Sequence, residues 1–211
     1  MTSIADIAIS TRVATLMGPV AVYFLVLGLL NTRRRPQMLT GRTDFALLIA
    51  ALSPLVFLPV LRFLGGSPLI ALAIAVLLAG MVLALSPSRS WVVYNISAYA
   101  AADAVAAALG KLGVDFARSA EGFVVEAEGI TITVGGFPLL RNATIRLRGA
   151  DRRFTRAFQA ALAVRLAAME CQPSPMAISM LLVAVIMLAA PLALMAQDAP
   201  QIVRLLTDLL R

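Results

Sequence analysis

Four long apolar runs without a charged residue constrain this chain more than any other feature. They are Val13–Leu30, Phe45–Leu61, Pro68–Leu85 and Met176–Ala196, and none of them contains Asp, Glu, Lys or Arg. Each run is about 17–21 residues long, and about 20 helical residues cross a hydrocarbon core of about 30 Å. With 61% hydrophobic residues in 211, a four-helix membrane protein fits better than a soluble domain, which has about 45–50%.

The basic residues between the first two runs predict the orientation. Arg33, Arg34, Arg35 and Arg42 lie in the short loop Asn31–Asp44, and an excess of Lys and Arg in short loops marks the cytoplasmic side. The polar segment between the third and fourth runs then lies in the cytoplasm as well, and both termini lie outside. We expect an integral protein of the bacterial inner (plasma) membrane.

The apolar runs divide the chain into three parts. Residues 1–86 carry three transmembrane helices, at about 13–30, 45–61 and 68–85. Residues 87–175 form a small cytoplasmic domain, and residues 176–211 carry the fourth transmembrane helix and a C-terminal amphipathic helix. Proline-containing joints at both ends of the domain predict that it is held against the membrane face.

Within residues 87–175 the hydrophobic period switches between that of strands and that of helices. The expected strands are Trp91–Ile96, Val114–Ser119, Phe123–Ala127, Ile130–Val134 and Thr144–Arg148, and the expected helices are Ala98–Leu112 and Arg152 to about Glu170. Ser97 and Asp151 are the expected N-caps. Consecutive strands favour an antiparallel sheet with both helices on one face, which is a two-layer α+β domain.

The chain is poor in groups that carry chemistry. It has no His and a single Cys171, which excludes an internal disulfide and a multi-Cys metal site. Gly135-Gly136 is expected in a loop and lacks the Lys-Ser/Thr of a phosphate-binding loop. The carboxylates show no pairing for acid–base catalysis, so we expect neither an enzyme nor a cofactor or metal.

A second basic set lies in the domain, within one strand–helix unit. Its members are Arg141, Arg146, Arg148, Arg152, Arg153 and Arg156. The expected contact residues are Arg152, Arg153 and Arg156, on the polar face of the last helix of the domain. Contact with anionic lipid headgroups, worth about 1 kcal/mol for each basic group, competes with a solvated face or ion pairs to a partner protein. Nucleic-acid binding would require a larger charge excess and exposed aromatic side chains, so no nucleic-acid partner is expected.

The C-terminal segment Ala199–Arg211 is amphipathic. Its apolar face includes Ile202, Leu205, Leu206 and Leu209. A helix of this kind lies in the membrane interface or docks on a partner protein.

The apolar runs contain no ionisable residue, which argues against coupled ion transport. Asp44 lies just before the second run, where it reaches headgroup water or pairs with Arg42. Pro54 and Pro59 predict a kink in the second run, and Ala71, Ala75 and Ala79 give the third a close-packing face toward a neighbouring helix or subunit.

Two functions remain open on these grounds. The first is a non-catalytic membrane subunit or scaffold that docks to other membrane subunits or to itself, and holds its domain at the membrane face. The alternative is a small oligomeric transport or lipid-handling protein. Both have membrane lipids as partners.

Overall fold

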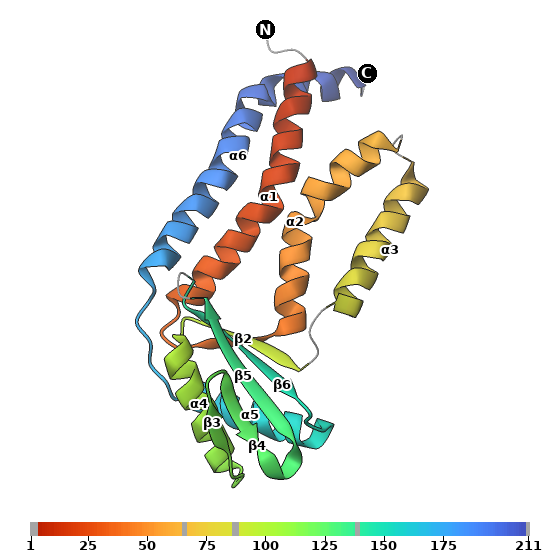
Figure 1. The fold of residues 1–211 in the computed structure, drawn as a ribbon. Coiled ribbons are helices and arrows are strands. Elements are labelled where there is room, and N and C mark those ends of the chain that lie inside the picture. Colours follow the sequence, from red (N-terminus) through yellow and green to blue (C-terminus); the bar gives the residue numbers. More distant parts are fainter. Residues whose placement is uncertain (1–3, 65–66, 86–88, 138–139, 210–211) are drawn as a thin grey trace.

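The computed structural model describes residues 4–64, 67–85, 89–137 and 140–209. Within these ranges, side chains are not described at positions 4–12, 68, 83, 194–195, 197–199, 201–206 and 208–209. The molecule has two parts, a set of long apolar helices and a smaller sheet domain below them (Figure 1).

Four helices form the apolar part of the described chain. They are α1 (Ile4–Thr32), α2 (Gly41–Phe63), α3 (Pro68–Leu85) and α6 (Pro175–Leu209). Three segments are long and apolar enough to cross a membrane, Val13–Thr32, Gly41–Phe63 and Pro175–Ala193, whereas the apolar stretch Leu69–Val82 of α3 is shorter. The structure therefore has three candidate membrane-spanning helices, and the expected fourth span is not established by it.

The C-terminal part differs from the sequence-based expectation. A separate amphipathic helix was expected at Ala199–Arg211, but α6 continues through Pro191 and Pro200 to Leu209. The helix turns near its C-terminal end instead of stopping (Figure 1). A proline removes one backbone hydrogen bond and kinks a helix without necessarily ending it, which accounts for a bent, continuous α6.

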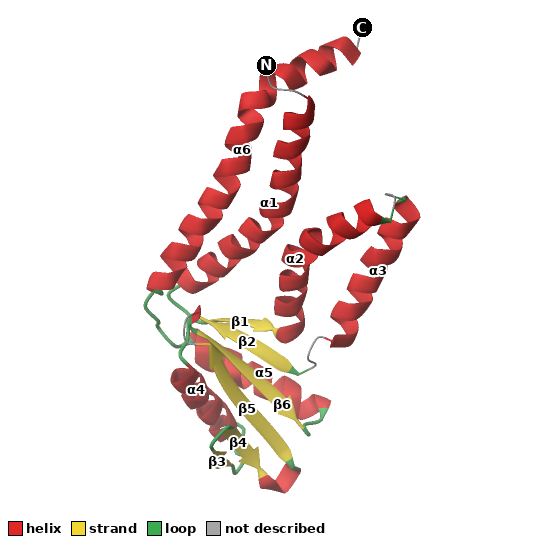
Figure 2. Ribbon diagram, turned by 45° about the horizontal axis from the view of Figure 1, so that its top comes forward, coloured by secondary structure: helices red, strands yellow, loops and turns green. Residues whose placement is uncertain are grey.

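The domain contains a six-stranded antiparallel sheet with the order β1-β2-β6-β5-β4-β3. The strands are β1 (Gln37–Thr40), β2 (Ser90–Tyr94), β3 (Ala117–Ser119), β4 (Gly122–Val125), β5 (Ile130–Phe137) and β6 (Asn142–Arg148). Two helices, α4 (Ala98–Lys111) and α5 (Arg152–Ala167), lie on one face of this sheet (Figure 2). The mixed architecture, the antiparallel sheet and the helix layer agree with the sequence-based prediction.

The core of the domain forms between the sheet and its two helices. Alternate sheet residues such as Trp91 and Ile145, which are paired in register, face Phe158 and Leu162 of α5 and Leu109 of α4. Trp91 and Phe158 have ring centroids 5.9 Å apart. Both expected N-caps are present: Ser97 Oγ accepts from Ala100 N at 3.2 Å, and Asp151 Oδ1 accepts from Phe154 N at 2.6 Å.

Several expected strand boundaries were wrong. Strand β3 begins at Ala117 instead of Val114. Strand β4 ends at Val125 instead of Ala127, and a short 3-10 turn, Glu126–Glu128, follows it. Gly135 and Gly136 lie inside β5, paired with Thr144 and Ala143, and not in a loop. A Cβ at position 136 would lie 2.7 Å from the Ala98 side chain, so glycine permits the close approach of the strand to α4.

Strand β1 was not expected. It lies in the predicted loop between the first two spans, outside residues 87–175, and pairs with β2 from Gln37↔Tyr94 to Thr40↔Trp91. Met38 packs against the domain core, whereas Leu39 packs on the opposite face of the sheet. The sheet domain is therefore assembled from two separate segments of the chain, and one of them directly connects α1 to α2.

Candidate functional site

A buried polar joint connects the end of α1 to the end of β2. Asn31 is 2% exposed, and its Oδ1 accepts from Asn95 N at 3.1 Å while its Nδ2 donates to Leu27 O at 2.9 Å. Asn95, in the left-handed conformation at φ 58°, donates from Nδ2 to Arg33 O at 2.8 Å. Asparagine tolerates this conformation better than most residues, so it suits position 95.

The segment that leads into α6 is tied to the same joint. Cys171 N donates to Arg34 O at 2.7 Å, and Ser174 N donates to Asn31 O at 3.2 Å. Burial raises the pKa of the Cys171 thiol, and nearby Arg141 opposes this shift. The segment that follows α1 and the segment that precedes α6 are thus joined by backbone hydrogen bonds.

An apolar cluster reinforces the joint from the sheet side. Val92 and Tyr94, on the β2 face opposite the domain core, pack with Leu27 of α1 and Met180 of α6. The Tyr94 hydroxyl donates to the carboxylate of Asp44 in α2. Burial, together with that carboxylate, raises the pKa of Tyr94. Asp44 accordingly bonds to the sheet, which was not among its expected partners.

The predicted loop arginines fall into two groups because β1 lies between them. Arg33, Arg34 and Arg35 are exposed beside the Asn95 end of β2. Arg42 is exposed in the first turn of α2, next to Gly41, which packs against Ser90 at the other end of β2. The two arginine groups lie at opposite ends of the five-residue strand β2, whose length is about 13–17 Å.

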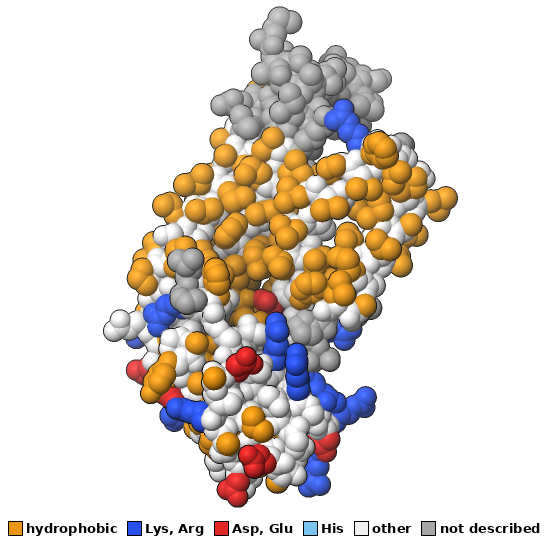
Figure 3. Space-filling view, viewed as in Figure 1, with side chains coloured by type: hydrophobic (Ala, Val, Ile, Leu, Met, Phe, Trp, Pro, Cys, Tyr) orange, Lys and Arg blue, Asp and Glu red, His pale blue; other side chains and the backbone are white. Residues whose placement is uncertain are grey.

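Apart from Arg141, whose carbonyl accepts from Ile96 N beyond the other end of β2, the second basic set lies on the Arg42 side of the sheet. Ser90 pairs with Arg146 of β6, and Arg89 donates to Ala150 O just before α5 begins. The predicted contact residues Arg152, Arg153 and Arg156 are exposed in the first two turns of that helix. Blue side chains gather below the apolar α2–α3 helices (Figure 3). We refer to Arg42, Arg89, Arg146, Arg152 and Arg153 as the basic rim.

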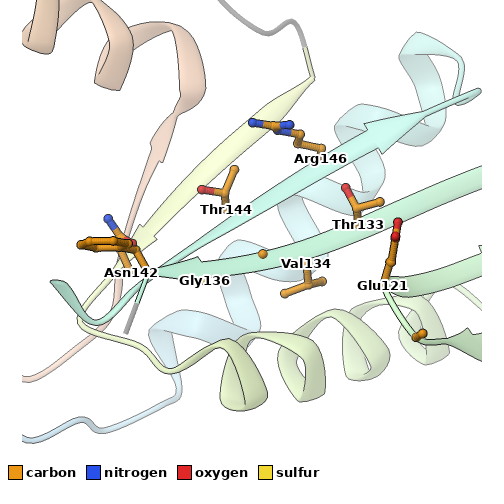
Figure 4. A pocket seen from close by; sticks show the side chains of 10 residues that line it. Glu121, Thr133, Val134, Gly136, Asn142, Thr144 and Arg146 are labelled. Carbon is orange, nitrogen blue, oxygen red and sulfur yellow. The ribbon is translucent and has the colours of Figure 1, made fainter. Parts of the chain in front are cut away.

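The open face of the sheet carries a polar hollow of 560 Å³. Thr133, Thr144, Arg146 and Glu121 project from the same side of the sheet, whereas Val134 points to the other side (Figure 4). The hollow offers a guanidinium, hydroxyls and a carboxylate as hydrogen-bonding groups. The only sequence signal for this face was the strand alternation that includes Thr133 and Arg146.

An apolar groove of 350 Å³ lies between α2 and α3. Its lining residues are Ala46, Ile49, Ala50, Ser53, Phe57, Ala75, Leu78, Ala79 and Val82. Two of the three predicted close-packing alanines, Ala75 and Ala79, thus face α2. The groove remains half open because these alanines are too small to fill it.

Other sequence-predicted features add no chemistry. Among the described residues, no three acidic or cysteine side chains come together as a metal site, and the one ion pair is Arg118–Asp103 at 2.9 Å. The side chains of Ile202, Leu205, Leu206 and Leu209 lie outside the described part, so their predicted contacts stay a prediction.

Comparison with known proteins gives no family, relative or fold neighbour: no family model, no curated protein and no solved structure matches the chain. Function must therefore be inferred from the joint, the polar hollow and the apolar groove alone.

Proposed function

We propose that this protein is a non-catalytic integral membrane subunit that binds partner proteins and holds its sheet domain at the membrane face. The joint carries this proposal. Strand β1, the Asn31–Asn95 hydrogen bond and the cluster around Tyr94 attach the sheet to α1 and α6. A domain held in this way presents its surfaces in one orientation, which suits a docking platform.

The polar hollow is the proposed docking surface for a partner protein. It combines Arg146, Glu121 and the threonine hydroxyls on a face that α4 and α5 leave uncovered. Hydrogen-bond donors and acceptors on an exposed sheet face match a polar segment of another protein. The C-terminal part of α6 is a second proposed contact, with other membrane subunits or with another copy. No nucleic-acid partner is proposed.

A partner pull-down tests this function. Full-length tagged protein is extracted in mild detergent, and co-purifying subunits are identified for the wild type, Arg146→Glu and a chain lacking 199–211. We expect a defined partner with the wild type and loss of one or more contacts in each variant. Arg118→Glu, on the distal strand β3, is the charge-matched control. A protein that purifies alone, whatever the variant, would contradict the proposal.

We also propose a four-span topology, with α3 as the additional span, in a bacterial inner membrane. The 18 residues of α3 extend about 27 Å, close to the hydrocarbon thickness of about 30 Å. The arginines at 33–35 and 42 support an orientation with the sheet domain in the cytoplasm and both termini outside.

Cysteine labelling tests the orientation. In a Cys171→Ser background, a cysteine replacing Glu121 should react with an impermeant maleimide only after the cells are opened. Labelling of intact cells would show that the topology is inverted.

A second candidate function is lipid handling or transport by an oligomer, and the half-open α2–α3 groove favours it. Flux of lipid or solute in proteoliposomes should then change when Pro54 and Pro59, which lie within α2, are both replaced by Ala. Absence of flux for every tested solute and lipid would remove this candidate.

A further inference from the structure

We infer that the α2–α3 groove holds an acyl chain of an anionic phospholipid, with the headgroup at the basic rim. The inference deepens the proposed function, since it rests on the proposed insertion of α3 in the membrane. It concerns the lipid-facing hairpin and the basic rim, of which Arg146 also lines the polar hollow.

The length of the groove along α2 is close to the thickness of the hydrocarbon layer of one membrane leaflet. From Ala46 to Phe57 the axis of α2 rises about 17 Å, and half of the hydrocarbon core measures about 15 Å. The volume of 350 Å³ lies near the lower end of ligand pockets, at about 300–1,000 Å³. Its walls are apolar, and Ser53 Oγ is engaged with Ala50 O at 2.9 Å, so an alkyl chain matches the surface.

Arg42 continues the groove toward the sheet domain. Positions 42, 46, 49, 53 and 57 follow each other at helical spacings of three or four, so they share one face of α2. Arg42 is exposed, lies one turn before Ala46 and forms no ion pair with any described residue. The nearest acidic residue, Asp44, accepts the Tyr94 hydroxyl instead. The mouth of the groove therefore carries a positive charge that no described carboxylate pairs with.

The sheet domain adds further positive charge below the same mouth. Arg146 lies on the strand next to Ser90, whose side chain contacts Gly41 at the start of α2. Two strand spacings of about 4.8 Å separate β6 from β1. Arg152 and Arg153 begin α5 nearby, and each basic group close to an anionic surface strengthens binding. The charge selects an anionic headgroup over a zwitterionic one, and a second protein copy would bring its own unpaired arginines to this mouth.

Native mass spectrometry of the delipidated, full-length protein in detergent tests the inference. The probes are phosphatidylglycerol and phosphatidylcholine with the same palmitoyl and oleoyl chains. Phosphatidylglycerol should bind more tightly. Arg42→Gln should weaken phosphatidylglycerol binding about fivefold, the ratio that corresponds to about 1 kcal/mol for one basic group, and leave phosphatidylcholine binding unchanged. Arg118→Gln, which removes the same charge far from the groove, should change neither.

Filling the groove tests the acyl-chain site separately. Ala50→Leu and Ala79→Leu place a larger side chain in an open space and should reduce binding of both lipids. Ala73→Leu, an exposed position of α3 that does not line the groove, should leave both unchanged.

Three results would overturn the inference. They are equal affinity for the two lipids, identical effects of Arg42→Gln and Arg118→Gln, and a dimer that Ala79→Leu dissociates while lipid binding persists. The last result would assign the groove to a second copy. None of these outcomes touches the partner pull-down, so the lipid site and the subunit function can fail independently.

Discussion

The α1–α6 pair and the α2–α3 hairpin have similar apolar sequences but very different packing. Gly28 of α1 lies so close to α6 that an added Cβ would be 2.7 Å from Leu181, whereas a Cβ at Gly80 of α3 would meet no atom within 4 Å. Leu27 is 5% exposed, and Leu72 is 62% exposed. The first pair is closely packed at these positions, whereas the second leaves its surface exposed.

The sheet domain accounts for this difference. It packs on α1 and α6 through Val92 and Tyr94 and holds their ends by hydrogen bonds at Asn31 and Ser174. The hairpin is attached through β1 and Asp44 at the foot of α2. Close packing of α1 and α6 therefore goes together with contact to the domain, and not with hydrophobicity alone.

The largest expected effect is the loss of a large side chain from the joint. Leu27→Ala should lower the free energy of unfolding by about 2–5 kcal/mol, because it leaves a cavity between α1, α6 and β2. The matched Leu72→Ala on α3 should change it by less than about 0.5 kcal/mol. Equilibrium unfolding in detergent micelles measures both, and equal effects would abolish the contrast between the two pairs.

Glycine substitutions test the same contrast through overpacking. Gly28→Val should destabilise by about 1–3 kcal/mol, because the new side chain collides with Leu181 and forces the helices apart. Gly80→Val, which meets open space, should be close to neutral. Thermal denaturation of the two variants in the same detergent compares them, and a destabilised Gly80→Val would mean that α3 has a packing partner.

Loss of a hydrogen bond in the polar joint should lower the free energy of unfolding by about 1–3 kcal/mol. Asn31→Ala removes the acceptor of Asn95 N, which is then buried without a hydrogen bond. Hydrogen exchange at the Asn95 amide should accelerate together with the loss of stability. The control is Thr32→Ala at the adjacent position. The Thr32 hydroxyl donates to Leu29 O within α1, so its loss should have little effect on the Asn95 amide.

The smallest expected effect concerns thiol reactivity at the joint. Because burial raises the pKa of Cys171, less thiolate is present at pH 8 than in the unfolded chain, and alkylation should be slower. Arg141 opposes the shift, so Arg141→Gln should raise the pKa further and slow the reaction again. Alkylation rates between pH 7 and 10 measure this, and a Cys171 as fast as the unfolded thiol would show an open joint.

Much of the domain was predictable because its signals are local. The Ser97 and Asp151 caps, the alternation in β6 and the helical spacing of Phe158 and Leu162 each involve residues close in sequence. β1 was missed because four residues between two helices are too few to show a period, and its partner Tyr94 lies more than fifty residues away. The polar hollow was missed because it combines separate elements. For the groove, the sequence indicated only the small-residue face of α3, which includes Ala75 and Ala79.

By itself, the sequence determined the apolar helices, the α+β domain and the scarcity of catalytic groups, since all three follow from composition and short-range periodicity. Only the tertiary structure decided how these parts are joined. It placed β1 in the sheet, bonded Tyr94 to Asp44, and formed the groove between α2 and α3. Such contacts depend on which surfaces meet in space, and residue spacing along the chain carries no record of them.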